Sequence, residues 1–252
     1  MSKRMTIMAK LIGLPVKILQ RLYANSWVNT MKWCWYQFSW RYLEWRLGIN
    51  TGEFSQKIVL GDDGECNGYE PIDFKCFDNA MDYLKVRPGK DVFLDYGCGK
   101  GRAVVLAATY PFQRVIGIER SPQLCTIAKE QVRKAKRKLK SQRVEIVNGD
   151  ATTYEVPQDV TKVFLFNSFT GNVLSDTLNR IRDSLVKFPR NFKIVYIFPK
   201  NDRNMLAECK WLREECILPT GFWTHVKSIV YDSRIEYVTI KAGKSAEVLI
   251  EH

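Results

Sequence analysis

From residue 92 onward the sequence alternates between short apolar runs and longer segments with helical periodicity. A strand in a parallel sheet is a near-continuous apolar run, because helices cover both faces of the sheet. Joining two parallel strands requires a crossover, which is usually a helix. The alternation therefore predicts an α/β domain with a doubly wound, mostly parallel sheet. The predicted strands are 92–95, 114–119, 144–148, 162–166 and 192–198, and the predicted helices are 102–110, 122–140 and 172–187.

The chain on either side of this alternation follows other patterns. Residues 74–86 have apolar side chains at helical spacing and precede a Pro-Gly turn, which predicts one more helix. Residues 211–218 and 227–240 are two runs without an intervening helix, which predicts an antiparallel hairpin at the edge of the sheet. Residues 48–68 carry five glycines in polar sequence, a composition typical of a linker loop.

Residues 1–47 form a basic, tryptophan-rich extension. It holds eight Lys and Arg residues against one acid, Glu44, and five of the seven tryptophans of the chain. Residues 3–24 have the spacing of a basic amphipathic helix. We expect a helical extension that either packs its aromatic side chains on the main domain or lies on an anionic membrane surface through residues 3–46. Tryptophan together with Lys and Arg suits the headgroup region of a bilayer.

A transmembrane helix or a signal peptide is not expected. A spanning helix needs about 20 nearly uncharged apolar residues, and the apolar stretch 5–19 is interrupted by Lys10 and Lys17. The same interruptions, and the lack of a small-x-small cleavage site, argue against a signal peptide. The seven cysteines are scattered without a C-x-x-C pair, and the chain has two histidines. This usage predicts reduced thiols in a cytoplasmic protein, with no disulfide framework and no metal site.

The net charge of +12 comes from two segments of the chain. Residues 1–47 contribute +7, residues 120–143 contribute +8 with nine basic residues against Glu130, and the remainder sums to −3. The second basic run ends a predicted helix, where cations complement the negative end of the helix dipole. Nucleic acid is therefore a less favoured partner than a protein, a small molecule or a membrane surface.

A glycine-rich loop, Asp95-Tyr-Gly97-Cys98-Gly99-Lys-Gly101, follows the first predicted strand and leads into a helix. A nucleotide-like ligand binds at this position in a parallel sheet, and glycines let it approach the backbone. The spacing differs from the dinucleotide fingerprint G-x-G-x-x-G and from the phosphate loop ending in G-K-[ST]. An acid beside the loop repels phosphate and attracts a cation. The loop therefore predicts a nucleoside-like ligand with a positive centre.

This loop resembles motif I, D-x-G-x-G-x-G, of the class I S-adenosylmethionine-dependent methyltransferases. The supporting motifs fall in the same order, with Glu119 ending the second strand, Asn-Gly-Asp at 148–150 after the third and Asn-Ser-Phe at 167–169 after the fourth. The similarity covers roughly residues 69–240. It implies a seven-stranded sheet in a domain over residues 69–252, preceded by the linker 48–68 and the extension 1–47.

The resemblance also implies a set of cofactor contacts. Asp95 and the glycines would surround the methionine and ribose portions of S-adenosylmethionine. Glu119 would accept hydrogen bonds from both ribose hydroxyls, as a carboxylate can. Asp150 would meet the adenine amino group. The complete implied set is Tyr69, Asp95, Gly97, Cys98, Gly99, Gly101, Glu119, Asp150 and Asn167.

Two further clusters concern the methyl acceptor. The order of Tyr69-Glu70-Pro, the glycine loop and Phe-Asn167-Ser-Phe169 is similar to that of the seven-strand histone lysine methyltransferases. The second cluster is also similar to the N-P-P-[YF] motif of amino-methyltransferases, with Ser168 and Phe169 in place of the two prolines. The resemblance implies N-methylation of a protein lysine or an amine-bearing small molecule. Asn167 would contact the acceptor nitrogen, Tyr69 and Phe169 would wall the transfer channel, and Glu70 would act on the acceptor or hold the ammonium group of the cofactor.

Two alternatives stay open at this stage. An O-methyltransferase acting on a sugar, phenol or lipid hydroxyl would use Glu70 or His225 as its base. A methyltransferase-fold binding module would bind the cofactor without catalysis. An amine acceptor must lose its proton before it attacks, since a free lysine with a pKa of about 10.4 is mostly charged at neutral pH. A dry pocket lined by hydrogen-bond acceptors would favour the neutral amine.

Overall fold

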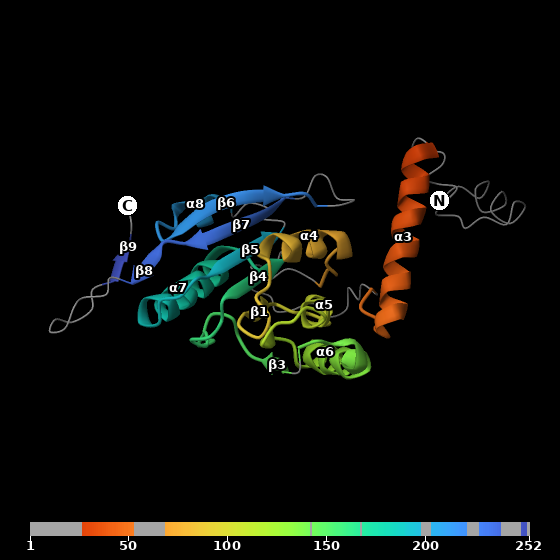
Figure 1. Cartoon of the computed structure of the whole chain (residues 1–252), viewed down its shortest axis with the longest axis horizontal. Coiled ribbons are helices and arrows are strands. Elements are labelled where there is room, and N and C mark those ends of the chain that lie inside the picture. The colour runs from red at the N-terminus through yellow and green to blue at the C-terminus, as the bar shows by residue number, and fades with distance from the viewer. Residues whose placement is uncertain are drawn as a thin grey trace, which may run out of the picture. The chain divides into compact units, whose positions relative to one another are not determined.

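The computed structural model describes residues 27–52, 69–141, 143–166, 168–197, 203–220, 227–237 and 248–250 (Figure 1). The chain divides into two compact units, Met1–Arg46 and Leu47–His252. Helix α3 (Trp27–Leu47) supplies the described part of the first unit. The helix predicted for residues 3–24 lies outside the described residues. Among the described helices, none combines the length and the apolarity that a bilayer-spanning segment requires.

The second unit is built on a seven-stranded sheet with the order β3-β2-β1-β4-β5-β7-β6. The first five strands in this order pair in parallel, and β7 pairs antiparallel with both β5 and β6. The predicted doubly wound, mostly parallel sheet with an antiparallel edge hairpin is therefore confirmed. The strands are β1 (Val92–Tyr96), β2 (Arg114–Glu119), β3 (Val144–Asn148), β4 (Lys162–Phe166), β5 (Lys193–Ile197), β6 (Leu212–Leu218) and β7 (Ser228–Ser233).

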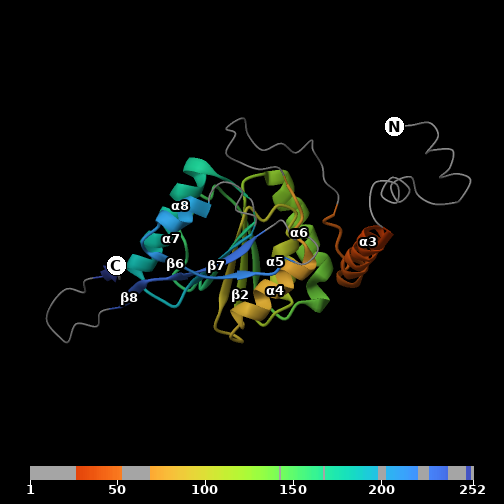
Figure 2. The same ribbon diagram turned by 90° about the horizontal axis from the view of Figure 1, so that it is seen from above.

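Helices cover both faces of this sheet. Helices α4, α5 and α6 lie on one face, and α7 and α8 lie on the other (Figure 2). The helices are α4 (Phe74–Leu84), α5 (Arg102–Ala108), α6 (Pro122–Ala135), the 3₁₀ turn η1 (Lys136–Lys138), α7 (Gly171–Lys187) and α8 (Arg203–Glu208). The six-residue helix α8 was not predicted, because so short a segment has too few apolar positions to show a helical period.

Side-chain caps set where two of these helices begin. The carboxylate of Asp73 accepts a hydrogen bond from the Cys76 amide at 2.8 Å, at the start of α4. Ser121 Oγ accepts one from the Leu124 amide at 3.3 Å, and Pro122 occupies the first turn of α6. Both residue types are favoured N-caps, because their side-chain oxygens satisfy amides that have no partner within the helix.

Helix α6 is shorter than the sequence predicted. The prediction extended it to residue 140, whereas the α-helix ends at Ala135 and the 3₁₀ turn η1 follows. Like charges four residues apart recur through this stretch and oppose a helix. The chain also finds other partners, since the amides of Lys140 and Ser141 donate to the carbonyl of Ala108 at the end of α5.

The predicted strand over residues 227–240 is divided in the structure. Strand β7 ends at Ser233, where its pairing with β6 also ends, and the Arg234 amide donates instead to the carbonyl of Trp211. The chain then changes partner, because β8 (Ile235–Tyr237) pairs antiparallel with β9 (Val248–Ile250) in a separate two-stranded sheet. The pattern of apolar residues alone does not reveal such a change of partner.

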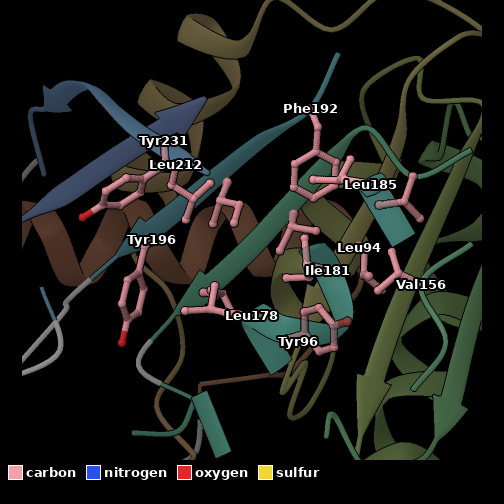
Figure 3. Packing of buried hydrophobic residues seen from close by; sticks show 14 of the residues in the cluster. Leu94, Tyr96, Val156, Leu178, Ile181, Leu185, Phe192, Tyr196, Leu212 and Tyr231 are labelled. Carbon is pink, nitrogen blue, oxygen red and sulfur yellow. The ribbon is translucent and has the colours of Figure 1, made fainter. Parts of the chain in front are cut away.

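The main core lies between the sheet and α7. Side chains from alternate positions of the strands, such as Leu94 and Tyr96, meet one face of α7 at Leu178, Ile181 and Leu185 (Figure 3). All five side chains are at most 2% exposed. Since successive strand residues point to opposite faces, Asp95 faces the other side of the sheet, where α4 and α5 lie.

Helix α4 anchors to that second face through one aromatic side chain. Phe77 is fully buried, and its ring centroid lies 6.1 Å from that of Phe93 in β1 and 5.4 Å from that of Phe164 in β4. This contact holds the segment before α4 close to the carboxyl ends of the central strands.

We predict that Phe77→Ala lowers the free energy of unfolding by about 3–5 kcal/mol, because it removes a fully buried aromatic ring and leaves a cavity. Urea unfolding followed by circular dichroism measures the change. Phe188→Ala, at a position 38% exposed, is the matched control and should cost clearly less. Equal losses for the two variants would contradict the assignment of Phe77 as the anchor of α4.

Candidate functional site

The glycine loop after β1 lies where the strand order reverses. Strand β1 pairs with β2 on one side and with β4 on the other, so the connections leave the sheet in opposite directions there. The carboxyl edge of a parallel sheet opens into a crevice at such a point. The amides of Gly97 and Cys98 both donate to the carbonyl of Ile118 at 2.9 Å, and the Gly101 amide donates to the carbonyl of Cys98 at 2.8 Å. These bonds fix the loop against β2.

All three glycines of the loop have positive φ values and close neighbours, and Gly101 has a φ of 82°. Gly97 and Gly99 have φ values of 72° and 54°, in the left-handed region that disfavours side chains. A Cβ at Gly97 would lie 2.6 Å from Cβ of Ser168, and one at Gly99 would lie 2.6 Å from Cε2 of Tyr69. Ser168 and Tyr69 therefore touch the loop from two sides.

The third glycine serves helix packing. A Cβ at Gly101 would lie 3.0 Å from Cβ of Ala128 in α6, so this glycine lets α5 and α6 approach each other. Gly101 does not line the pocket described next. Its predicted contact with the cofactor stays a prediction, whereas its packing role is visible in the structure.

A pocket opens above the loop, with an empty volume of about 970 Å³ including the solvent at its mouth. The structure brings together nine of the residues predicted from the sequence in its lining, namely Tyr69, Glu70, Asp95, Gly97, Cys98, Gly99, Glu119, Asp150 and Phe169. Asn167 and His225, also singled out from the sequence, lie outside the described residues.

Asp95 is a buried acid that faces this pocket. The residue is 3% exposed, and no residue in the described part of the chain donates a hydrogen bond to its carboxylate. Burial, and secondarily the neighbouring Glu119, raise the pKa of Asp95 to about 8. A buried carboxylate without a donor is costly unless a cation neutralises it. The pocket is therefore suited to a positively charged ligand group at this point.

Glu119 ends β2 beside the loop and is also 3% exposed. Its Oε2 accepts a hydrogen bond from the Gly99 amide at 2.8 Å, and its Oε1 accepts one from the Ser121 amide at 2.9 Å. Burial raises the pKa of Glu119, and these backbone bonds partly offset that effect. The Arg120 amide is a further backbone donor to this carboxylate, which retains capacity for one more hydrogen bond from a ligand hydroxyl.

Asp150 also lines the pocket, and its side chain is 42% exposed. Its Oδ1 accepts hydrogen bonds from the amide and the hydroxyl of Thr152, at 2.8 and 2.7 Å. These bonds, with the charge of Arg120, hold the pKa of Asp150 below its ordinary value. Nε of Arg120 lies 3.9 Å from Oδ2 of Asp150. The carboxylate is thus held in place and ionised, with Oδ1 bonded to Thr152 and Oδ2 near Arg120.

Tyr69 and Glu70 form the side of the pocket that precedes α4. The Tyr69 hydroxyl donates to the carbonyl of Thr51 at 2.6 Å, and Nζ of Lys100 lies 5.2 Å from the centroid of its ring. Glu70 is exposed and lines the pocket, which places it at the solvent side. The segment therefore sets one rigid aromatic wall beside one accessible acid.

The segment after β4 contributes Ser168 and Phe169 to the lining of the pocket. Ser168 Oγ donates to the carbonyl of Tyr96 at 2.6 Å, which ties this segment to the end of β1. Phe169 is 6% exposed, lines the pocket, and also belongs to the main core, with its ring 6.3 Å from that of Tyr96. Phe169 is therefore a fixed wall whose position depends on the core.

Cys98 is a buried thiol next to the two acids. Burial, followed by the charges of Asp95 and Glu119, raises its pKa well above the ordinary value. A protonated thiol is a poor nucleophile. Cys98 is therefore a small lining residue of the pocket, and its contact with the cofactor stays a prediction.

Arg102 was not selected from the sequence, although it organises one side of the pocket. This residue is 2% exposed, and its guanidinium donates to Thr51 Oγ1 at 2.7 Å and to the carbonyl of Ile72 at 2.9 Å. Its position could have drawn attention to it, because a cation in the first turn of a helix opposes the helix dipole. A cation at this position needs hydrogen-bond acceptors outside its own helix, and here Thr51 and Ile72, both distant in the sequence, supply them.

The comparisons with known proteins point to one kind of domain. Residues 93–187 match a protein family described as a methyltransferase domain. A search of curated proteins finds no match.

Similar folds occur among solved structures. An RNA methyltransferase from Salinibacter ruber in complex with S-adenosyl-L-homocysteine shares 21% identity, with a TM-score of 0.48, over 65% of this chain and 94% of that one. A precorrin 8w decarboxylase from Methanobacterium thermoautotrophicum shares 18% identity, with a TM-score of 0.49, over 69% of this chain and 100% of that one. Magnesium protoporphyrin IX methyltransferase from Synechocystis with bound S-adenosylmethionine shares 13% identity, with a TM-score of 0.47, over 66% and 86%.

We predict that Asp95→Asn stabilises the protein without ligand, and that the gain grows with pH. Because the pKa of Asp95 is higher in the folded protein than in the unfolded chain, the folded state binds this proton more tightly. The stabilisation from this proton is complete below about pH 3.9, the ordinary pKa of the side chain, and is lost as the pH rises toward about 8. The variant carries no such cost, so its advantage in unfolding free energy should exceed about 1 kcal/mol at pH 8 and be smaller at pH 5.

Urea unfolding at the two pH values measures this difference. Asp176→Asn, at an exposed acid of α7, is the control and should show no pH-dependent gain. A destabilised Asp95→Asn variant at pH 8 would contradict the description of Asp95 as a buried carboxylate without a donor.

Proposed function

We propose that the protein transfers a methyl group from S-adenosylmethionine to the nitrogen of an amine, since residues 93–187 match a methyltransferase domain and the pocket lies at the carboxyl edge of the seven-stranded sheet. The acceptor is a lysine side chain of a protein or an amine-bearing small molecule. The observation that carries the proposal is that the exposed acid Glu70 lines the same pocket as the aromatic residues Tyr69 and Phe169.

The residues of the pocket fit the cofactor. S-adenosylmethionine carries a sulfonium and an ammonium group, and the buried carboxylate of Asp95 lacks a donor among the described residues. Glu119 can accept a further hydrogen bond from a ribose hydroxyl, and Oδ2 of Asp150 can accept one from the adenine amino group. Gly97 and Gly99 lack side chains where the ligand meets the backbone. When bound, the cofactor supplies an electrophilic methyl group for direct displacement.

The main task of the protein is then to align the acceptor with that methyl group. Holding two reactants in line can supply much of the acceleration of such a reaction. Tyr69 is fixed by its bond to the carbonyl of Thr51, and Phe169 is fixed by the core. Walls that are fixed in this way can restrict the acceptor to one direction of approach.

Glu70 gives the site a means to receive an amine. An amine arrives in water mostly as a cation, which an acid and aromatic faces attract. The carboxylate of Glu70 can orient that cation and accept its proton, after which the neutral nitrogen has the lone pair that the reaction needs. The contact of Asn167 with the acceptor nitrogen stays part of the proposal, since this residue lies outside the described ranges.

We predict that Glu70→Gln lowers kcat/KM for the amine acceptor at least about tenfold, because general base catalysis and cation attraction are both lost. Affinity for S-adenosylhomocysteine, measured by calorimetry, should stay unchanged. Glu155→Gln, at an exposed acid outside the pocket lining, is the matched control and should keep full activity. A loss of cofactor affinity with an unchanged acceptor KM would instead assign Glu70 to the ammonium group of the cofactor.

Transfer of tritium-labelled methyl groups to separate panels of lysine peptides, small amines, phenols and sugars tests the choice of acceptor. Label in the amine panels supports the proposal. Label only in hydroxyl acceptors would replace it with O-methylation, and binding of cofactor without transfer to any panel or cell fraction would indicate a binding module.

We further predict that Asp95→Asn weakens binding of S-adenosylmethionine at least about tenfold, because a buried charge-assisted contact contributes about 1.5–3 kcal/mol. Calorimetry at pH 8 measures the change. The same variant is expected to be the more stable protein, so reduced affinity cannot be attributed to unfolding. Unchanged affinity would contradict the assignment of Asp95 to the cationic part of the cofactor.

A further inference from the structure

Helix α3 carries a row of large apolar side chains that are open to solvent. The row consists of Met31, Trp35, Phe38, Tyr42 and Trp45, which are 54%, 72%, 64%, 48% and 75% exposed. Their spacing of four, three, four and three residues places them on one face of the helix. At a rise of about 1.5 Å per residue, this aromatic row is about 21 Å long. A continuous exposed row of this kind marks an interaction surface.

The rings of the aromatic row are also arranged as neighbours. The ring centroids of Trp35 and Phe38 are 6.2 Å apart, and those of Tyr42 and Trp45 are 5.9 Å apart. Tryptophan and tyrosine have an apolar body and a polar tip, so they favour the boundary between water and hydrocarbon. The composition of the row thus favours an interface over a fully apolar environment.

Positive charge surrounds the aromatic row. Arg41 and Arg46 are exposed, and their positions relative to Tyr42 and Trp45 place one on each side of the row. Glu44 is the only acid in residues 1–47, against eight basic residues. By its spacing Glu44 falls on the opposite side of the helix, and it is 8% exposed. The open face of α3 is therefore both aromatic and cationic.

A second copy of α3 would be a poorer match for this face. The spacing of the row is that of the a and d positions of a coiled coil, which prefer branched aliphatic side chains. Arg41 and Arg46 would then occupy g and e positions. In a parallel pair of helices, Arg41 of one copy would lie beside Arg46 of the other, and the two like charges would repel each other.

We propose that α3 lies in the plane of an anionic lipid bilayer surface. The aromatic row inserts at the level of the headgroups, and Arg41 and Arg46 extend along both sides of it to lipid phosphates. The surplus of seven positive charges in residues 1–47 attracts the same surface. The length of the row and its flanking charges fit a helix that lies on the membrane. This inference does not depend on the identity of the methyl acceptor.

Sedimentation of the full chain with lipid vesicles tests the proposal. We expect binding to vesicles of phosphatidylcholine with phosphatidylserine, and much weaker binding to phosphatidylcholine alone. Raising the salt concentration should weaken binding, because salt screens the charges. Trp35→Ala/Trp45→Ala should lower the partition coefficient at least about tenfold, since two large side chains leave the interface.

Two further variants complete the test. Arg41→Glu/Arg46→Glu should remove the preference for phosphatidylserine, whereas Phe188→Ala, on an exposed aromatic residue outside α3, should bind as the unchanged protein does. Affinity for S-adenosylhomocysteine is measured on each variant, and an unchanged value shows that the methyltransferase domain remains folded. Vesicle binding requires no methyl transfer. Absence of vesicle binding would therefore contradict this inference and leave the proposed methyltransferase function untouched.

Three results would overturn the proposal. The first is absence of binding to either kind of vesicle. The second is binding that both double variants leave unchanged. The third is a dimer in analytical ultracentrifugation that the Trp35→Ala/Trp45→Ala variant abolishes, which would assign the aromatic row to a second copy of the chain.

Discussion

The site depends on the hydrogen bonds that tie the glycine loop to β2. The carbonyl of Ile118 accepts from both Gly97 and Cys98, and the carboxylate of Glu119 accepts from Gly99. Two consecutive residues of one strand thus hold three consecutive amides of the loop. This places two acids, Asp95 and Glu119, in the same wall, although they come from neighbouring strands. The arrangement also requires Gly117, where a Cβ would lie 2.6 Å from Val104 and 2.9 Å from Cys98 Sγ.

Much of the sheet could be predicted because each strand can be recognised from the residues of that strand alone. Each parallel strand is a short apolar run, and the bounds predicted for 114–119, 144–148 and 162–166 agree with β2, β3 and β4. Features that depend on distant partners were missed. Strand β7 ends at Ser233 because its pairing with β6 ends, and α6 ends early because residues 140 and 141 bond to the end of α5. Neither partner is visible in the local sequence.

The candidate site shows the same division between local and distant information. Asp95, Glu119 and the glycines could be selected because their spacing along the chain is characteristic. The sequence did not reveal that Tyr69 packs on Gly99, that Arg102 bonds to Thr51, or that Gly101 serves the packing of α6. These contacts join residues that are far apart in the chain, and the first two position residues that line the pocket.

The raised pKa of Cys98 has a consequence for chemical resistance. Alkylating agents and peroxides attack the thiolate form of cysteine, and burial beside two acids keeps this thiol protonated. We therefore expect the thiol of Cys98 to react only slowly with oxidants and alkylating reagents. A ligand that carries an electrophilic methyl group can lie against Cys98 without modifying the protein that holds it.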